Sequence, residues 1–320
     1  MTMPLPSLVI AGERRCGTTS LANSLSAHPE VFMHSKRDSG YFVDVHIRKG
    51  GPQIDWDATH SIPDYERFFS DATGANKVVV GEKSADYLFF APAHERLARF
   101  LPEAKFLLIL RNPVARAWSH YWNEVGKGRE TLSFPEALKA EKRRQAKGGF
   151  EAYHLSYVAR GKYDVSLANF FKFIPRKQCH VVILETLMTQ TLSSLREITA
   201  FLGIAEFEHE PLRAPGNSNW TMVPRPWAAQ QPVRAVANLY VGIAKGAVSL
   251  VGADREHKRR IMRTLSMPFF REASSIAMDK TTRAELTEIF DPHIGRLEDM
   301  LGSSLSLWRV DDAKFAPGKH

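Results

Sequence analysis

Cysteine is scarce in this sequence. Only Cys16 and Cys179 occur among 320 residues, far apart and with no cysteine or histidine at ligand spacing nearby. This distribution argues against a disulfide framework and against a structural zinc site, and it favours a reducing compartment. A chain of this length can bury a hydrophobic core that needs neither kind of cross-link.

Long hydrophobic runs are missing as well. No basic segment followed by a long apolar one opens the chain, so we expect no signal peptide and a cytoplasmic protein. The most apolar later stretch, residues 235–251, is interrupted by Lys245 and by glycines, which makes it too short and too broken for a membrane span. Residues 227–260 mix apolar and basic side chains and could contact a membrane surface, although core packing is the commoner role of such a segment.

Acidic residues are outnumbered by basic ones. The 43 Lys and Arg against 35 Asp and Glu give a formal net charge of +8. This balance favours an anionic partner, such as nucleic acid, a phosphorylated cofactor, an acidic glycan or a membrane surface. Because the basic residues are spread along the chain and form no single stripe, we expect no nucleic acid as partner and rank a nucleic-acid-binding module behind an enzyme.

Short apolar runs alternate with helical patterns, which is typical of βαβ units around a parallel sheet. We predict an α/β fold: a P-loop-like, three-layer domain over residues 1–320 with a central parallel sheet, and mostly loop and helical additions over 204–320. The predicted strands are 8–11, 78–80, 106–110 and 180–184. The predicted helices are 17–27, 93–101, 114–124, 191–201 and 283–301, with helical patterns also over 134–173 and 233–308 and a loop over 211–231.

The segment after the first predicted strand has the layout of a phosphate-binding loop: Gly12-Glu-Arg-Arg-Cys-Gly17-Thr18-Thr19. Glycines permit a tight turn, and backbone N–H groups at a helix N-terminus bind phosphate. Thr18 stands where nucleotide triphosphatases have lysine, so the loop suits a 5′-phosphate better than a Mg²⁺-bound triphosphate. The alternative is a strand–helix turn without a ligand. The candidate binding residues are Arg14, Arg15, Cys16, Gly17, Thr18, Thr19 and Ser20.

A second basic segment follows the third predicted strand and begins Arg111-Asn-Pro. Asn112 can cap the next helix, and Pro113 fits its first turn. Arg111 then lies at the carboxyl end of a strand, where open α/β sheets bind ligands, and Ser119 lies about two turns into the helix. A surface arginine and a packing serine are the alternative. A P-loop kinase, the main rival enzyme, would need an acidic Mg²⁺ ligand at such a strand end.

Together these two segments resemble the PAPS-dependent sulfotransferases, most of all the heparan-sulfate-type branch and its bacterial relatives. The resemblance implies transfer of a sulfuryl group from 3′-phosphoadenosine 5′-phosphosulfate (PAPS) to an acceptor, with release of adenosine 3′,5′-bisphosphate (PAP) and without a metal. It implies that the loop holds the 5′-phosphosulfate and that Arg111 and Ser119 hold the 3′-phosphate. Arg15 stands where the family usually has lysine. Tyr163, in Arg160-Gly-Lys-Tyr163, resembles a position near the nucleotide, or is a core aromatic.

The same resemblance suggests catalytic residues. Lys83, in Gly81-Glu82-Lys83-Ser84, resembles the family's lysine near the transferred group, so Lys83 and Arg15 are candidates for stabilising the leaving phosphate.

Two residues compete as the base. Asp38 falls at the position of the family's glutamate in K-E-x-H-[FY]-F, one methylene shorter, and Gly40 replaces the histidine. His34 is the rival base, with a suitable ordinary pKa. Alternatively, Asp38 only pairs with Arg37 or caps a turn. As acceptor we expect a hydroxyl or amine of a carbohydrate, a glycolipid or a natural product, that is, of a glycan, a lipid-linked molecule or a small molecule.

Overall fold

The computed structural model describes residues 5–34, 38–50, 55–72, 77–209, 222–224, 239, 243, 248, 261, 264–266, 270–272 and 276–309. At its centre lies a five-stranded parallel sheet with the strand order β2-β3-β1-β4-β5. The strands are β1 (Leu8–Gly12), β2 (Val31–Met33), β3 (Val79–Ser84), β4 (Lys105–Leu110) and β5 (Cys179–Ile183). The predicted α/β fold with a central parallel sheet is confirmed.

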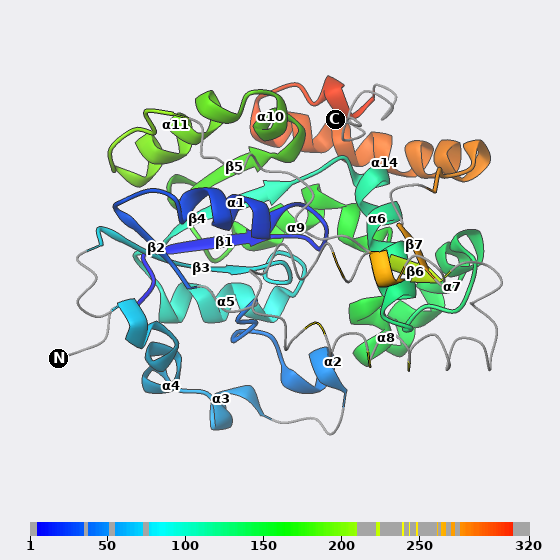
Figure 1. The fold of residues 1–320 in the computed structure, drawn as a ribbon, viewed down its shortest axis with the longest axis horizontal. Helices are drawn as coiled ribbons and strands as arrows, with labels where there is room; N and C mark the ends of the chain where they lie inside the picture. The colour runs from blue at the N-terminus through cyan, green and yellow to red at the C-terminus, as the bar shows by residue number, and fades with distance from the viewer. Residues whose placement is uncertain are drawn as a thin grey trace.

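Helices surround this sheet. They are α1 (Thr18–Leu25), α2 (Val45–Lys49), α3 (Trp56–Thr59), α4 (Ile62–Glu66), α5 (Ala91–Phe100), α6 (Pro113–Gly126), α7 (Phe134–Lys147), α8 (Gly149–His154), α9 (Tyr163–Phe170), α10 (Leu184–Thr189), α11 (Thr191–Leu202) and α14 (Lys280–Leu301). Short 3₁₀ helices are η1 (Arg67–Ala72), η2 (Ala159–Gly161), η3 (Arg176–Gln178) and η6 (Ser306–Trp308). In Figure 1 the sheet crosses the middle of the molecule, with α10, α11 and α14 above it and α5 below.

The central strands are continuous apolar runs because both of their faces are covered. Leu8 to Ala11 in β1 and Leu107 to Leu110 in β4 are wholly buried. Strand β3 is the exception, since it continues to Ser84 through the polar residues Glu82 and Lys83. Its predicted end at residue 80 was therefore too early, and the three-residue strand β2 was not predicted at all.

The C-terminal region differs from the prediction in one respect. Strands β6 (Met222–Pro224) and β7 (Phe270–Glu272) form a small antiparallel pair inside segments predicted as loop and helix. The remainder of 211–275 lies largely outside the described residues, and a single domain for the whole chain stays a prediction. The predicted last helix is confirmed as α14, and Trp308 beyond it is buried against Tyr163 with a ring-centre distance of 5.8 Å.

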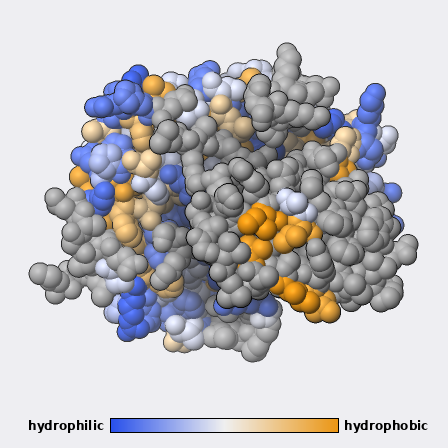
Figure 2. Space-filling model, in the orientation of Figure 1, coloured by the Kyte–Doolittle hydropathy of each residue, from blue (hydrophilic) through white to orange (hydrophobic). Residues whose placement is uncertain are grey.

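The described surface is mixed. Large apolar side chains are exposed on several elements, for example Ile62 and Val165. Figure 2 shows hydrophilic and hydrophobic residues interspersed on the left of the visible face, and a group of hydrophobic residues together to the right of its centre. The interspersed exposure is normal for a globular protein. Within the described ranges, no helix has the length and apolar character needed to cross a membrane.

Candidate active site

The predicted phosphate loop connects β1 to α1 at the carboxyl end of the sheet. It contains two left-handed residues, Arg15 with φ 71° and Gly17 with φ 97°. The backbone angle of Gly17 favours glycine, and a Cβ atom there would lie 2.8 Å from Cδ1 of Leu184, so any side chain would also have to displace Leu184. Helix α1 begins at Thr18, and its first N–H groups have no acceptor within the helix. The segment therefore has the geometry of an anion-binding loop.

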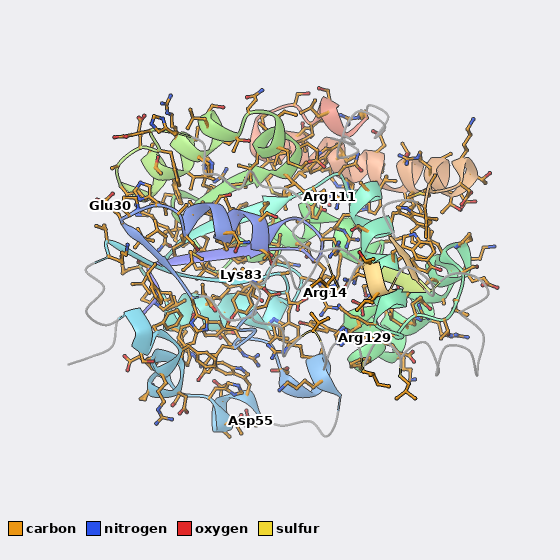
Figure 3. All side chains as sticks on the ribbon, in the orientation of Figure 1. Arg14, Glu30, Asp55, Lys83, Arg111 and Arg129 are labelled. Carbon is orange, nitrogen blue, oxygen red and sulfur yellow. The ribbon has the colours of Figure 1, made fainter. Side chains whose placement is uncertain are left out.

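The two predicted phosphate segments are in direct contact. Nε of Arg15 donates a hydrogen bond to Oγ of Ser119 at 2.9 Å, and Nη1 of Arg111 donates to the carbonyl oxygen of Arg15 at 3.1 Å. Burial, followed by the nearby charge of Arg111, lowers the pKa of Arg15 to about 10, so the Arg15 guanidinium stays charged at neutral pH. In Figure 3, Arg14 and Arg111 lie toward one end of the sheet, and Glu30 lies toward the other.

Tyr163 fixes the backbone beneath this contact. Its hydroxyl donates to the carbonyl oxygen of Arg111 at 2.8 Å and lies 3.5 Å from Sγ of Cys16. Both side chains are buried, and burial raises the pKa of the Cys16 thiol to about 11. The two residues thus hold the loop and the Arg111 turn together from the core side, and the Cys16 thiol is neutral at physiological pH.

The predicted cap of helix α6 is present. Oδ1 of Asn112 accepts from the N–H groups of Val114 at 2.9 Å and Ala115 at 3.2 Å. Nδ2 of Asn112 donates to the carbonyl oxygen of Trp308 at 2.9 Å. Glu185 completes the arrangement, because its carboxylate accepts from N–H of Asn112 at 2.9 Å and from Nε1 of Trp308 at 3.0 Å. These bonds hold the residue next to Arg111 in place; sequence reasoning had given Glu185 no role.

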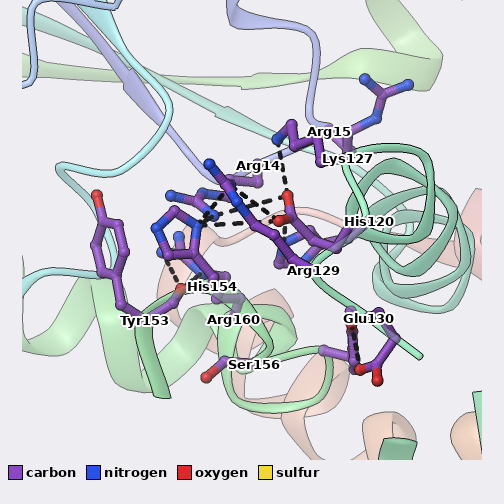
Figure 4. Close-up of polar contacts among 12 residues, drawn as sticks. Arg14, Arg15, His120, Lys127, Arg129, Glu130, Tyr153, His154, Ser156 and Arg160 are labelled. Atoms are coloured by element: carbon purple, nitrogen blue, oxygen red, sulfur yellow. Dashed lines mark hydrogen bonds and ion pairs between the residues drawn. The ribbon is translucent and has the colours of Figure 1, made fainter. Parts of the chain in front are cut away.

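The side chain of Arg14 is held by the protein itself. Its Nε donates to Oδ1 of Asp86 at 2.7 Å, and its Nη1 lies 2.7 Å from Nδ1 of His154 (Figure 4). Burial opposes ionisation of Asp86, but the charges of Arg14 and Arg160 outweigh it and lower its pKa. Arg160 also pairs with the buried carboxylate of Glu13 at 2.9 Å. We therefore expect Arg14 to meet a phosphate with its backbone N–H only.

A second part of this charge network centres on Glu124. Its buried carboxylate pairs with Lys127 at 2.8 Å and with Arg129 at 3.0 Å, and Arg14 lies 3.9 Å away. Sequence reasoning missed Glu124, Arg129 and His154. Glu124 is close in sequence to Lys127 and Arg129, but the contacts that connect this group to Arg14 join residues far apart in the chain and leave no local signal. The available sequence signal was the presence of basic residues at the predicted loop, which favours a nearby carboxylate but does not identify it.

The two main catalytic candidates also meet. Nζ of Lys83 donates to Oδ1 of Asp38 at 2.5 Å, and Lys83 stands opposite Ile10 in the register of β3 with β1. The side chain of Asp38 is 38% exposed, whereas His34 is buried with its ring 5.9 Å from Phe68 and 5.6 Å from Phe69. Of the two base candidates, Asp38 is therefore the one that an acceptor could reach.

No group of three or more His, Cys, Asp or Glu side chains among the described residues is arranged to hold a metal ion. Thr18 is buried at the start of α1, and Thr19 and Ser20 are half-buried beside it. The structure brings Arg15, Ser119 and Arg111 into one cluster, and it pairs Asp38 with Lys83 near the end of β3.

Several known proteins are similar to this chain in sequence. A family model described as "Sulfotransferase family" matches residues 46–209, just over half of the 320-residue chain. The human bifunctional heparan sulfate N-deacetylase/N-sulfotransferase 2 is 28% identical over 211 residues, which are 63% of this chain and 22% of that protein. The membrane-associated sulfotransferase kil1 of Dictyostelium discoideum is 32% identical over 117 residues, covering 37% of this chain and 22% of that protein. The chain thus spans about a fifth of the length of these curated relatives.

A solved structure agrees over nearly the whole chain. The crystal structure of a sulfotransferase from Alicyclobacillus acidocaldarius superposes with a TM-score of 0.67 at 26% identity, and the match covers 96% of this chain and all of that one. The fold, the phosphate loop and these similarities agree. The chain belongs to the sulfotransferase family.

Proposed function

We propose that this protein transfers the sulfuryl group of PAPS to a hydroxyl or amine of an acceptor and releases PAP. The observation that carries the proposal is the contact between the two phosphate segments through Arg15, Ser119 and Arg111. A nucleotide with phosphates at both its 5′ and 3′ positions could bind the loop through one phosphate and Arg111 and Ser119 through the other. ATP has no 3′-phosphate to bind Arg111 and Ser119, which disfavours the kinase alternative.

The proposed reaction is an in-line displacement at sulfur. The bond from sulfur to the bridging phosphate oxygen breaks as a bond forms from sulfur to the acceptor oxygen or nitrogen, and the electron pair leaves with the phosphate of PAP. Alignment of donor and acceptor supplies a large share of such rate enhancements. Arg15, Lys83 and the N–H groups at the start of α1 would stabilise the charge that develops on the leaving phosphate.

We propose that Asp38 is the general base that removes the proton from the acceptor's hydroxyl or amine. A general base must come within hydrogen-bond distance of that proton, and the exposed part of Asp38 permits this, whereas His34 lies among aromatic side chains. Lys83, in contact with Asp38, would then sit between the base and the transferred group. We propose no metal for this scheme, since a sulfuryl group carries less charge than a terminal phosphoryl group and cationic side chains are available.

For the acceptor we propose a carbohydrate, free or lipid-linked, with a natural-product hydroxyl as the next candidate. The support comes from the human relative, whose name assigns it N-sulfotransferase activity on heparan sulfate. We also propose contact with a membrane surface, because the name of the Dictyostelium relative calls it membrane-associated. Residues 227–260, predicted as the contacting segment, lie largely outside the described residues. A cytoplasmic location stays a prediction.

The test is a transfer assay with PAPS and an acceptor panel. The panel would contain heparosan oligosaccharides with free amines, neutral oligosaccharides, a glycolipid, simple phenols and a tyrosine peptide, with mass spectrometry to detect the sulfated product. Sulfation of a carbohydrate or glycolipid is the expected result. Sulfation of only the phenols or the peptide would contradict the acceptor proposal, and phosphorylation from ATP with Mg²⁺ would contradict the reaction itself.

A further inference from the structure

The turn after Asp38 contains a glycine whose side-chain position is filled by an arginine. Gly40 has φ 54°, a left-handed angle that favours glycine. A Cβ atom on Gly40 would lie 1.6 Å from Nη1 and 2.8 Å from Cζ of Arg48. Separations this short are impossible between non-bonded atoms, so the guanidinium of Arg48 occupies the space in which any side chain at position 40 would begin.

From this position Arg48 holds the residue next to the proposed base. Its Nη1 donates to the carbonyl oxygen of Ser39 at 2.9 Å. The hydroxyl of Ser39 is held from the other side, since it contacts the carboxylate of Glu82 and lies 2.8 Å from the hydroxyl of Tyr87. Ser39 is thus fixed through both its backbone and its side chain, and Asp38 directly before it contacts Lys83.

Arg48 is itself connected to the phosphate loop. Its carbonyl oxygen lies 2.8 Å from Nε2 of His154, whose Nδ1 faces Nη1 of Arg14 at 2.7 Å and Nη1 of Arg129 at 3.0 Å. Because both guanidiniums can only donate, Nδ1 accepts and Nε2 carries the hydrogen that Arg48 receives. Burial, followed by the charge of Arg14, lowers the pKa of His154 to about 4, so the ring is neutral at physiological pH.

We propose that Arg48 is a positioning residue for Asp38. Its guanidinium occupies the space beside Gly40, donates to the carbonyl oxygen of Ser39, and so keeps Asp38 beside Lys83. The inference rests on the proposed function, in which Asp38 accepts the acceptor's proton. The side-chain hydrogen bond of Arg48 goes to Ser39 and not to Asp38 or Lys83, so its effect on the base would pass through Ser39. Arg48 and Gly40 would then act as a unit, because a side chain at position 40 displaces the guanidinium.

The test compares Arg48→Ala, Arg48→Lys, Gly40→Ala and the double variant Arg48→Ala/Gly40→Ala. The measured quantity is kcat for PAP release from PAPS, once with free-amine heparosan oligosaccharide as acceptor and once with water alone. We expect this kcat to fall about 10- to 100-fold in Arg48→Ala, since a misplacement of about 1 Å can cost this much. PAP affinity by calorimetry should stay within about twofold, well below the factor of ten that 1.4 kcal/mol represents. Arg48→Lys, which keeps a donor for Ser39, should retain an intermediate kcat.

The double variant tests whether Arg48 and Gly40 act together. Gly40→Ala alone should lower kcat, and Arg48→Ala/Gly40→Ala should lose less than the two single losses combined. The clash with the guanidinium is then absent, and only the strain of a side chain at φ 54° is added to the loss of Arg48. Arg67→Ala is the control, since the Arg67 side chain is 72% exposed and pairs only with Asp64 among the contacts found for it. Thermal unfolding identifies any variant that fails to fold, and the remaining variants then carry the comparison.

Several outcomes would overturn the proposal. An unchanged kcat in Arg48→Ala would remove the role altogether. A loss of PAP affinity equal to the loss in kcat would assign the Arg48 side chain to nucleotide binding and not to the positioning of Asp38, because the backbone carbonyl of Arg48 that contacts His154 is still present in Arg48→Ala. Losses that add in the double variant would separate Arg48 from Gly40. If the wild-type protein itself fails to bind PAP, the proposed function is contradicted, and the inference about Arg48 falls with it.

Discussion

Replacement of Ser119 by alanine should weaken binding of PAP but leave binding of adenosine 5′-monophosphate unchanged. If Ser119 contacts the 3′-phosphate, the variant loses one hydrogen bond to a charged group, which is worth about 1.5–3 kcal/mol. The protein without nucleotide also loses the 2.9 Å bond from Nε of Arg15 to Ser119, and this offsets part of the cost of the loss in the complex. We therefore expect the lower end of that range, about a tenfold increase in Kd for PAP.

Isothermal titration with the two nucleotides isolates this effect. Adenosine 5′-monophosphate lacks the 3′-phosphate, so its Kd should be the same for wild type and Ser119→Ala. Ser193→Ala, in helix α11 with its hydroxyl bonded only locally to the carbonyl of Gln190, is a matched control and should change neither Kd. Equal weakening of both nucleotides would refute the assignment of Ser119 to the 3′-phosphate, as would no weakening of PAP.

Three further predictions follow from the site. Asp38→Asn should lower kcat for transfer by about 10²- to 10⁴-fold, the range for loss of a general base, and should leave PAP affinity unchanged in calorimetry. A larger loss of kcat in His34→Asn would reverse the assignment of the base. Gly17→Ala should weaken PAP binding at least tenfold and lower the melting temperature, because φ is 97° and Leu184 lies 2.8 Å from the added carbon; unchanged values would contradict the described loop geometry. The pKa of His154 is about 4 in the folded protein against an ordinary 6.5, so between these pH values the unfolded state binds more protons and wild-type stability should fall as the pH falls from about 6.5 to about 4. Urea unfolding should show a smaller fall in stability for His154→Gln, and an equal fall would contradict this assignment.

Local signals in the sequence were enough to predict the elements that form the proposed nucleotide side of the site. The apolar run of β1, the glycines of the loop and the Asn112-Pro113 start of α6 each lie within a few residues of the feature that they indicate. Parallel strands end at the same edge of a sheet, so the prediction that Arg111 lies near a ligand site needed no knowledge of the tertiary contacts. The meeting of Arg15 with Ser119, 104 positions apart, did require the structure.

The parts that could not be predicted depend on partners distant in sequence. Arg14 is separated from Asp86 by 72 positions and from His154 by 140, so nothing in its own segment indicated that its side chain is held by the protein. Strand β3 continues through Glu82 and Lys83, whose charges conceal it from a search for apolar runs. The replacement of a histidine by Gly40 was visible in the sequence, but only the structure shows Arg48 in the space that results.

The most direct test of the central claim is titration of PAP into the wild-type protein and into Arg111→Ala, each with and without Mg²⁺. The account predicts tight binding to wild type that is the same with and without Mg²⁺, and binding to Arg111→Ala that is at least about tenfold weaker, since a charge-assisted bond to the 3′-phosphate is lost. Absence of PAP binding, or binding of ATP only in the presence of Mg²⁺, would contradict the account and favour a P-loop kinase.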